Sequence, residues 1–265
     1  MPRILLCFFL AALGDNNNAV TEYNFDFTDS QFDQDYLRLM ASEDVNAWDF
    51  IYREPVGLRM ALPADRDVQM VAFANRFPVR GDFEITAKYT ILHSDSPAQG
   101  YGTGPGIYIK TLSSGESVAV LARLIRPAEG NVYSAYFATL RRDGSRWHQP
   151  TFEETNSTRG SLRLTRIGKN LQYYVAEGDS RDFRLVRAIR LGSNDVAIVR
   201  VGVDKGGSES AIEVIWEELE VRMHPTNRRE IVLVVGLLPL GALLILLLLQ
   251  LRRRKNRSDD VRLHE

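Results

Sequence analysis

Apolar and polar residues alternate along most of this chain. The clearest example spans residues 83–91, where Phe83, Ile85 and Ala87 are separated by polar residues such as Glu84 and Lys88. An alternation with a period of two predicts a β-strand that buries one face and exposes the other. The same pattern predicts further strands at residues 23–28, 56–62, 69–74, 107–111, 118–126, 132–140, 161–166, 171–176, 182–191, 195–203 and 211–223.

About a dozen strands, separated by turns of Gly, Pro, Asp and Ser, predict an all-β domain that is an antiparallel sandwich or barrel. Gly168 lies in a short predicted hairpin loop, where a positive φ is useful. Only residues 32–40 resemble a helix, with one or two turns at residues 34–42. Residues 141–151 are expected to form a polar connection, followed by Glu153 and Glu154 in a loop.

A long apolar run lies near the C-terminus. Residues 231–251 contain no charged residue and are followed directly by a basic cluster, Arg252, Arg253, Arg254, Lys255 and Arg257. A helix of about 20 residues spans the roughly 30 Å hydrocarbon core of a membrane, and a basic flank favours the cytoplasmic side. We therefore expect a transmembrane helix at residues 231–251. Residues 252–265 would form a cytoplasmic tail whose six basic and three acidic residues attract anionic headgroups.

The N-terminus has the layout of a secretory signal peptide. Arg3 precedes an apolar stretch too short to span a bilayer, and Ala12 and Gly14 provide small residues at the −3 and −1 positions of a cleavage site. Residues 1–14 are therefore expected to be removed. Residues 15–223 would form one extracytoplasmic domain, joined by a stem at residues 224–230 to the membrane helix, in a single-pass type I orientation.

Composition and charge narrow the function classes. The only cysteine, Cys7, lies in the predicted signal peptide, which excludes disulfides, thiolate metal sites and a cysteine nucleophile from the exported domain. A domain of about 210 residues can be stable through its core alone, and the lack of cysteine favours a bacterial envelope protein over a cysteine-rich animal receptor. Residues 15–226 carry 24 basic and 30 acidic residues, a net charge of −6, which argues against nucleic-acid binding.

Several short motifs resemble concanavalin A-like (laminin-G-like) jelly rolls. They are Phe25-Asp26-Phe27, Val56-Gly57-Leu58-Arg59, Gly81 to Thr86, Gly160 to Gly168 with Leu171-Gln172-Tyr173-Tyr174, and Trp216 to Arg222. More particularly, residues 23–222 resemble an uncharacterised bacterial family of exported domains. The resemblance implies an antiparallel jelly-roll β-sandwich whose last strand returns beside the first. Because this fold serves lectins, glycoside hydrolases and adhesive modules, a function drawn from it is an analogy.

The first expected function is recognition of a glycan or of a cell-envelope partner on an open sheet face. Aromatic rings stack on sugars, and charged side chains make strong hydrogen bonds to hydroxyls. A solvated face with cross-strand ion pairs explains the same residues more simply and stays open as an alternative. The candidate ligand-binding residues are Glu84, Lys88, Tyr101, Tyr108, Lys110, Arg123, Tyr136 and Trp147.

The second expected function is glycoside hydrolysis, which needs two carboxylates about 5 to 9.5 Å apart. Relatives that cleave β-glucans often carry these carboxylates as Glu-x-Asp-x-(x)-Glu on one strand, and this chain has no such string. The nearest group has a different spacing and no Asp: Glu213, Glu217, Glu218 and Glu220. The catalytic residues are therefore unknown, and a non-enzymatic role is favoured.

No motif identifies a cofactor. The glycine-rich residues 100–106 lead into a strand and lack the Lys-Ser or Lys-Thr of a phosphate-binding loop. The four histidines are scattered, so no histidine metal site is expected. Calcium held by loop oxygens, as in many members of the superfamily, stays open as an alternative at residues 93–97, which include Asp95.

Overall fold

The computed structural model describes residues 19–28, 32–42, 45–112, 116–140 and 143–224. The predicted signal peptide, transmembrane helix and cytoplasmic tail lie outside these residues, as does nearly all of the predicted stem. Within the described residues, no helix is both long and apolar enough to cross a membrane. The membrane topology therefore stays a prediction from the sequence.

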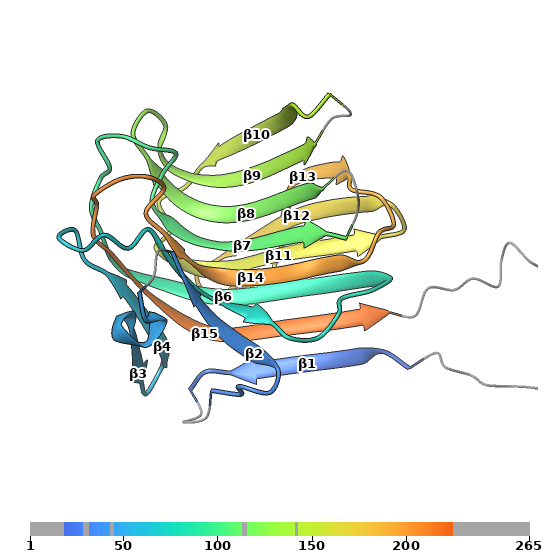
Figure 1. The fold of residues 1–265 in the computed structure, drawn as a ribbon, viewed down its shortest axis with the longest axis horizontal. Coiled ribbons are helices and arrows are strands. Elements are labelled where there is room, and N and C mark those ends of the chain that lie inside the picture. Colours follow the sequence, from blue (N-terminus) through green and yellow to red (C-terminus); the bar gives the residue numbers. More distant parts are fainter. Residues whose placement is uncertain (1–18, 29–31, 43–44, 113–115, 141–142, 225–265) are drawn as a thin grey trace, which may run out of the picture. The chain divides into compact units, whose positions relative to one another are not determined.

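The described residues form two antiparallel sheets (Figure 1). Sheet A has eight strands. Its order is β13 (Arg184–Arg190), β12 (Asn170–Glu177), β11 (Arg159–Ile167), β6 (Asp82–Ser94), β15 (Ile212–His224), β4 (Gly57–Leu62) and β3 (Ile51–Glu54), with β1 (Thr21–Asp26) also paired to β15. Sheet B has seven strands in the order β10 (Arg146–Glu154), β9 (Gly130–Leu140), β8 (Ser117–Arg126), β7 (Gly104–Thr111), β14 (Val196–Asp204), β5 (Met70–Asn75) and β2 (Leu37–Ala41).

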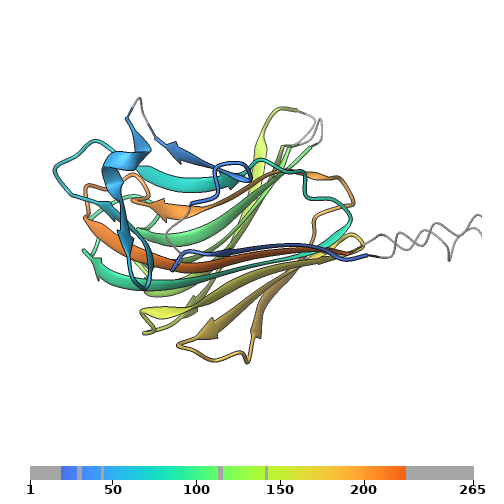
Figure 2. The same cartoon turned by 90° about the horizontal axis from the view of Figure 1, so that it is seen from below.

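One continuous hydrophobic core lies between the sheets, which form the two layers seen in Figure 2. Phe83, Ile85 and Tyr89 of β6 are fully buried and belong to the same cluster as Ile107 and Ile109 of β7. The alternation predicted for residues 83–91 is therefore confirmed. It leaves the polar residues of β6 on the outer face of sheet A.

The first and last strands are neighbours, as the resemblance to jelly rolls implies. Thr21 of β1 lies opposite Met223 of β15, so the described chain enters and leaves the sandwich at the same place. The predicted hairpin after β11 is also present, and Gly168 in its turn has a φ of 60°. The all-β antiparallel sandwich expected from the sequence is confirmed.

Residues 32–40 do not form the expected helix, because a turn leads there into strand β2. The short helix of this region lies instead at Ala47–Phe50, a 3-10 helix whose first turn is capped by the side chain of Asn46. Strand β3 follows it and pairs with β4. The four-residue β3 has a single buried residue, too few to show a period of two.

The expected polar connection after residue 140 is in part an edge strand. Strand β10 pairs with β9 over its whole length and includes Glu153 and Glu154, which were expected in a loop. Most residues of β10 are exposed on both faces, so no apolar alternation marks it in the sequence. Its backbone pairing with β9 defines it as a strand.

Arg123 does not lie on the outer face where we expected it. Its side chain is 2% exposed and donates to the carbonyl oxygens of Ser157 (2.9 Å) and Leu124 (2.7 Å) and to Asn131 Oδ1 (2.8 Å). The expectation was wrong because β8 is apolar at five consecutive positions, which hides the phase of the strand: Val118, Ala119, Val120, Leu121 and Ala122.

Candidate ligand-binding site

Four adjacent strands of sheet A carry polar side chains on their outer face. In the register of these strands, Lys88 of β6 lies opposite Ser161 of β11 on one side and Glu218 of β15 on the other. The next outward position of β6, Thr86, lies between Arg163 and Glu220 in the same way. Alternate positions fill the core, so the outward ones form one continuous polar surface.

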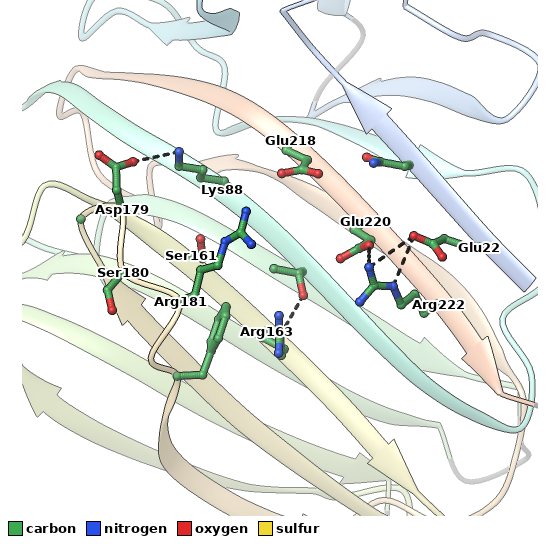
Figure 3. A pocket seen from close by; sticks show the side chains of 14 residues that line it. Glu22, Lys88, Ser161, Arg163, Asp179, Ser180, Arg181, Glu218, Glu220 and Arg222 are labelled. Carbon is green, nitrogen blue, oxygen red and sulfur yellow. Dashed lines mark hydrogen bonds and ion pairs between the residues drawn. The ribbon is translucent and has the colours of Figure 1, made fainter. Parts of the chain in front are cut away.

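A pocket of about 620 Å³ lies on this surface. Strands β1, β6, β11 and β15 supply its floor, and residues 178–183, which connect β12 to β13, supply a further wall. Figure 3 shows its labelled side chains converging from β1 and β15 on one side and from β6, β11 and the connection on the other. Its volume falls within the range common for small-molecule sites.

Asp179 attaches the β12–β13 connection to the sheet. Its carboxylate lies 2.9 Å from Lys88 Nζ and 2.8 Å from Arg159 Nη2. Both cations also contact Glu217, at 2.9 Å for Lys88 and 3.3 Å for Arg159. Burial raises the pKa of Glu217, but the hydrogen bonds from Lys88, Thr90 and Arg159 outweigh it, and the pKa ends below its usual value. Glu217 is therefore ionised and engaged in structure.

Arg163 connects the sheet to the β12–β13 connection, because it contacts residues of both. Its Nε donates to Thr86 Oγ1 (2.9 Å), and its guanidinium lies 3.7 Å from the centre of the Phe183 ring. Glu84 lies behind it, with a carboxylate oxygen 3.4 Å from Arg163 Nη1. The stacking holds Phe183 against the sheet and leaves the edges of the guanidinium, which carry its N–H groups, for polar partners.

A group of carboxylates lines the pocket along β1 and β15. Arg222 binds Glu220 and lies 3.3 Å from Glu22 and 3.8 Å from Glu84. Burial and a hydrogen bond shared with Glu22 raise the pKa of Glu220, against the opposing effect of Arg222. Glu218 lies two residues before Glu220 and adds its charge to the same side of the pocket.

We expect the substitution Glu22→Gln to lower the pKa of Glu220, because it removes a negative charge that disfavours ionisation of the neighbouring carboxyl. Because the folded pKa of Glu220 lies above its unfolded value, this carboxyl contributes stability at low pH and loses that contribution as the pH rises through the folded pKa. A carbon NMR titration of the Glu220 carboxyl measures the shift. Glu54→Gln, near Arg59 rather than Glu220, should leave the titration unchanged.

Two charged residues of the pocket have no ion pair or side-chain hydrogen bond within the described ranges: Glu218 on β15 and Arg181 in the β12–β13 connection. Both are exposed, and both line the cavity. A carboxylate accepts hydrogen bonds only, whereas a guanidinium donates only. Among its charged side chains, the pocket therefore offers an incoming ligand one unpaired acceptor, Glu218, and one unpaired donor, Arg181.

The sequence-predicted residues are divided between the two sheets. Lys88 lines the pocket, and Glu84 lies beside it, bound to Arg163. On the outer face of sheet B, the ring of Tyr108 lies 4.3 Å from the Arg200 guanidinium, Lys110 pairs with Glu116 at 2.7 Å, and Tyr136 stacks on His148. The structure does not bring these residues together with Lys88.

The remaining predicted residues lie apart from the pocket. Tyr101 precedes β7 and is hydrogen-bonded to Asp204, while Trp147 lies on the edge strand β10 with its ring near Phe137. The carboxylate of Asp95, where calcium was considered, accepts from His93 and from the backbone of Ala211. The described residues contain no group of three or more His, Cys, Asp or Glu placed to hold a metal ion.

Sequence reasoning missed Arg163, Arg181, Glu22 and Arg222 as pocket residues, and it considered Glu218 and Glu220 only as a catalytic string. The alternation of polar residues in β11 and β15 marks an exposed face. It does not show that β1 adds Glu22 to that face, or that a later connection closes it. Pairing between residues about 200 positions apart creates this site.

Comparisons with known proteins agree with the jelly-roll fold. A family model described as "Protein of unknown function (DUF1583) C domain" matches residues 12–224. A comparison with curated protein sequences gave no match. The jelly-roll fold that the motifs imply is confirmed by solved structures that share this architecture.

Three of these structures illustrate the likeness. One, described as "Prominent members of the human gut microbiota express endo-acting O-glycanases to initiate mucin breakdown", has a TM-score of 0.58 and 11% identity over 77% of this chain and 99% of its own. A Crh5 transglycosylase in complex with NAG has a TM-score of 0.52 and 11% identity, over 77% of this chain and 85% of its own. A Bacillus licheniformis β-glucanase has a TM-score of 0.51 and 7% identity, over 77% of this chain and 98% of its own. At such identities the likeness establishes the fold alone.

Proposed function

We propose a function from the pocket itself, because this chain belongs to the DUF1583 C-domain family, whose description assigns no activity. The protein is a membrane-anchored extracytoplasmic module that binds a glycan of the cell envelope in the pocket on the outer face of sheet A. The observation that carries this proposal is the lining of the pocket, in which four strands and the β12–β13 connection bring donor and acceptor side chains together.

Sugars match such a lining because each ring presents several hydroxyls that both donate and accept. Hydrogen bonds in which one partner is charged are stronger than neutral ones, and the pocket supplies them from both guanidinium and carboxylate groups. Arg163, Arg181 and Lys88 donate, whereas Glu218 and Glu220 accept. The solved structures of similar fold include proteins described as an O-glycanase and a β-glucanase, which supports a carbohydrate ligand by analogy.

The proposed location rests on the two ends of the sequence. The signal peptide at residues 1–14 exports the domain, the helix at residues 231–251 anchors it, and the basic tail at residues 252–265 stays inside. The start of β1 lies beside the end of β15. Removal of the signal peptide and attachment of the anchor therefore affect the same end of the sandwich.

The test is a glycan-array screen of the full chain in a polyoxyethylene detergent, whose headgroup contains no sugar. We expect binding to at least one envelope-type glycan and no release of reducing sugar from it. Failure to bind any glycan contradicts the proposal.

Hydrolysis is the second candidate, because Glu220 has a raised pKa and Glu218 lies two residues away on the same strand. Such positions are roughly 6.6 Å apart along a strand, within the spacing that glycosidases use. Glu22 is less suited to be the second catalytic carboxyl, because it interacts directly with Glu220 and lies 3.3 Å from Arg222. Release of reducing sugar that is lost in both Glu218→Gln and Glu220→Gln would establish this activity instead.

A further inference from the structure

The charged residues of the pocket are separated by sign between its two sides. Strands β1 and β15 contribute three carboxylates and one guanidinium, a formal charge of −2, from Glu22, Glu218, Glu220 and Arg222. Strands β6 and β11 and the β12–β13 connection contribute three cations and one carboxylate, a formal charge of +2, from Lys88, Arg163, Arg181 and Asp179. The pocket is neutral as a whole and strongly dipolar.

Some charged residues of the pocket are paired within the protein, and others are not. Asp179 is engaged with Lys88 and with Arg159, so the connection is already attached to the sheet. Glu218 and Arg181, by contrast, have no side-chain partner within the described ranges, and they come from different elements, β15 and the β12–β13 connection (Figure 3). Each side thus keeps one charge that a ligand can satisfy.

From this separation we infer that the pocket recognises a glycan that carries both an ammonium group and a carboxylate. The ammonium group faces Glu218 on the β15 side, and the carboxylate of the ligand faces Arg181 on the other. This inference rests on the proposed function, since it names the class of glycan that the same pocket binds.

The side of the pocket formed by β1 and β15 has the charge to bind a cation. Glu22 and Glu220 share a hydrogen bond, and Arg222 is the only cation of that side in the described pocket lining. An ammonium group placed near Glu218 and Glu220 relieves the repulsion among these carboxylates, which a neutral hydroxyl does only weakly. Conversely, a ligand with a cation alone leaves the guanidinium of Arg181 unpaired.

Four monosaccharides that share one ring test this inference. Muramic acid carries an amine and a carboxylate, N-acetylmuramic acid the carboxylate alone, glucosamine the amine alone, and N-acetylglucosamine neither. NMR titrations of the full chain in a polyoxyethylene detergent, at about pH 6.5 where a sugar amine is protonated, give the four dissociation constants. We expect muramic acid to bind at least tenfold more tightly than N-acetylglucosamine, with the two singly charged sugars between them.

Two substitutions assign the charges to residues. Glu218→Gln should remove the advantage of muramic acid over N-acetylmuramic acid, because these sugars differ only in whether the nitrogen is a charged amine or a neutral acetamide. Arg181→Gln should remove the advantage of muramic acid over glucosamine, because these sugars differ only in the lactyl ether that carries the carboxylate. The matched controls Glu154→Gln on β10 and Arg190→Gln on β13 change exposed residues outside the pocket and should leave all four constants unchanged.

The outcomes separate this inference from the proposed function. Equal affinity for all four sugars overturns the inference and leaves a glycan-binding pocket. A preference for charged sugars that survives both Glu218→Gln and Arg181→Gln also overturns it. If none of the four sugars binds and the glycan array is also negative, both proposals fail.

Discussion

Replacing Trp216 by alanine is expected to lower the free energy of unfolding by about 3–5 kcal/mol, the range for deleting a large buried aromatic side chain. Trp216 is 0% exposed on β15, and its ring meets Phe73 of sheet B and Tyr89 of sheet A edge-on, each at 6.2 Å between ring centres. It therefore joins the two sheets. For a domain of this size, the loss corresponds to a fall in Tm of roughly 6–20 °C.

Two further variants identify the source of this effect. The indole Nε1 of Trp216 is buried and has no hydrogen-bond partner among the described residues. Trp216→Phe removes this unpaired donor and keeps much of the ring, so we expect a cost below about 2 kcal/mol. Trp48→Ala, at a position 41% exposed, should cost under about 1 kcal/mol. Equal losses in Trp216→Ala and Trp48→Ala, measured by thermal and urea unfolding, would contradict a central role for Trp216.

Arg163→Ala is expected to weaken glycan binding by about 10- to 100-fold. The substitution removes charge-assisted hydrogen bonds, which contribute about 1.5–3 kcal/mol each. It also removes the guanidinium that lies over Phe183, and with it one of the contacts that hold the β12–β13 connection against the sheet. Titration of the full chain with a glycan identified in the array measures the loss.

Arg200→Ala is the matched control on the opposite sheet. Arg200 lies 4.3 Å from the centre of the Tyr108 ring, so it makes the same kind of contact on the outer face of sheet B. We expect this variant to bind as well as the unaltered chain. A loss in Arg200→Ala with none in Arg163→Ala would place the ligand on sheet B, among Tyr108, Lys110 and Tyr136 as the sequence suggested.

The sequence predicts the strands best where one face is apolar and the other polar. Strand β6 meets this condition over residues 83–91, and its burial alternates as predicted from Phe83 to Tyr89. Strand β8 is apolar on both faces near its start, so the orientation of Arg123 could not be predicted. Strand β10 is largely exposed, and only its pairing with β9 makes it a strand.

The candidate site was only partly predictable, for a different reason. Lys88 was found because its own strand shows that it faces outward. Glu22 joins the pocket through the pairing of β1 with β15, and Arg181 through the path of the β12–β13 connection. Local alternation contains no information on which strands become neighbours. The division of charge between the two sides of the pocket could therefore be seen only in the folded chain.

The position of β15 has a mechanical consequence. This strand is hydrogen-bonded to β6 on one side and to β4 and then β1 on the other, and it is the last described element before the predicted anchor. Antiparallel hydrogen bonds run perpendicular to their strands, so a pull along β15 loads many of them in shear at once instead of opening them one by one. If the chain is anchored as proposed, β15 both forms part of the pocket and connects the sandwich to the anchor. Tension between a captured glycan and the membrane would then pass along the strand best placed to resist it.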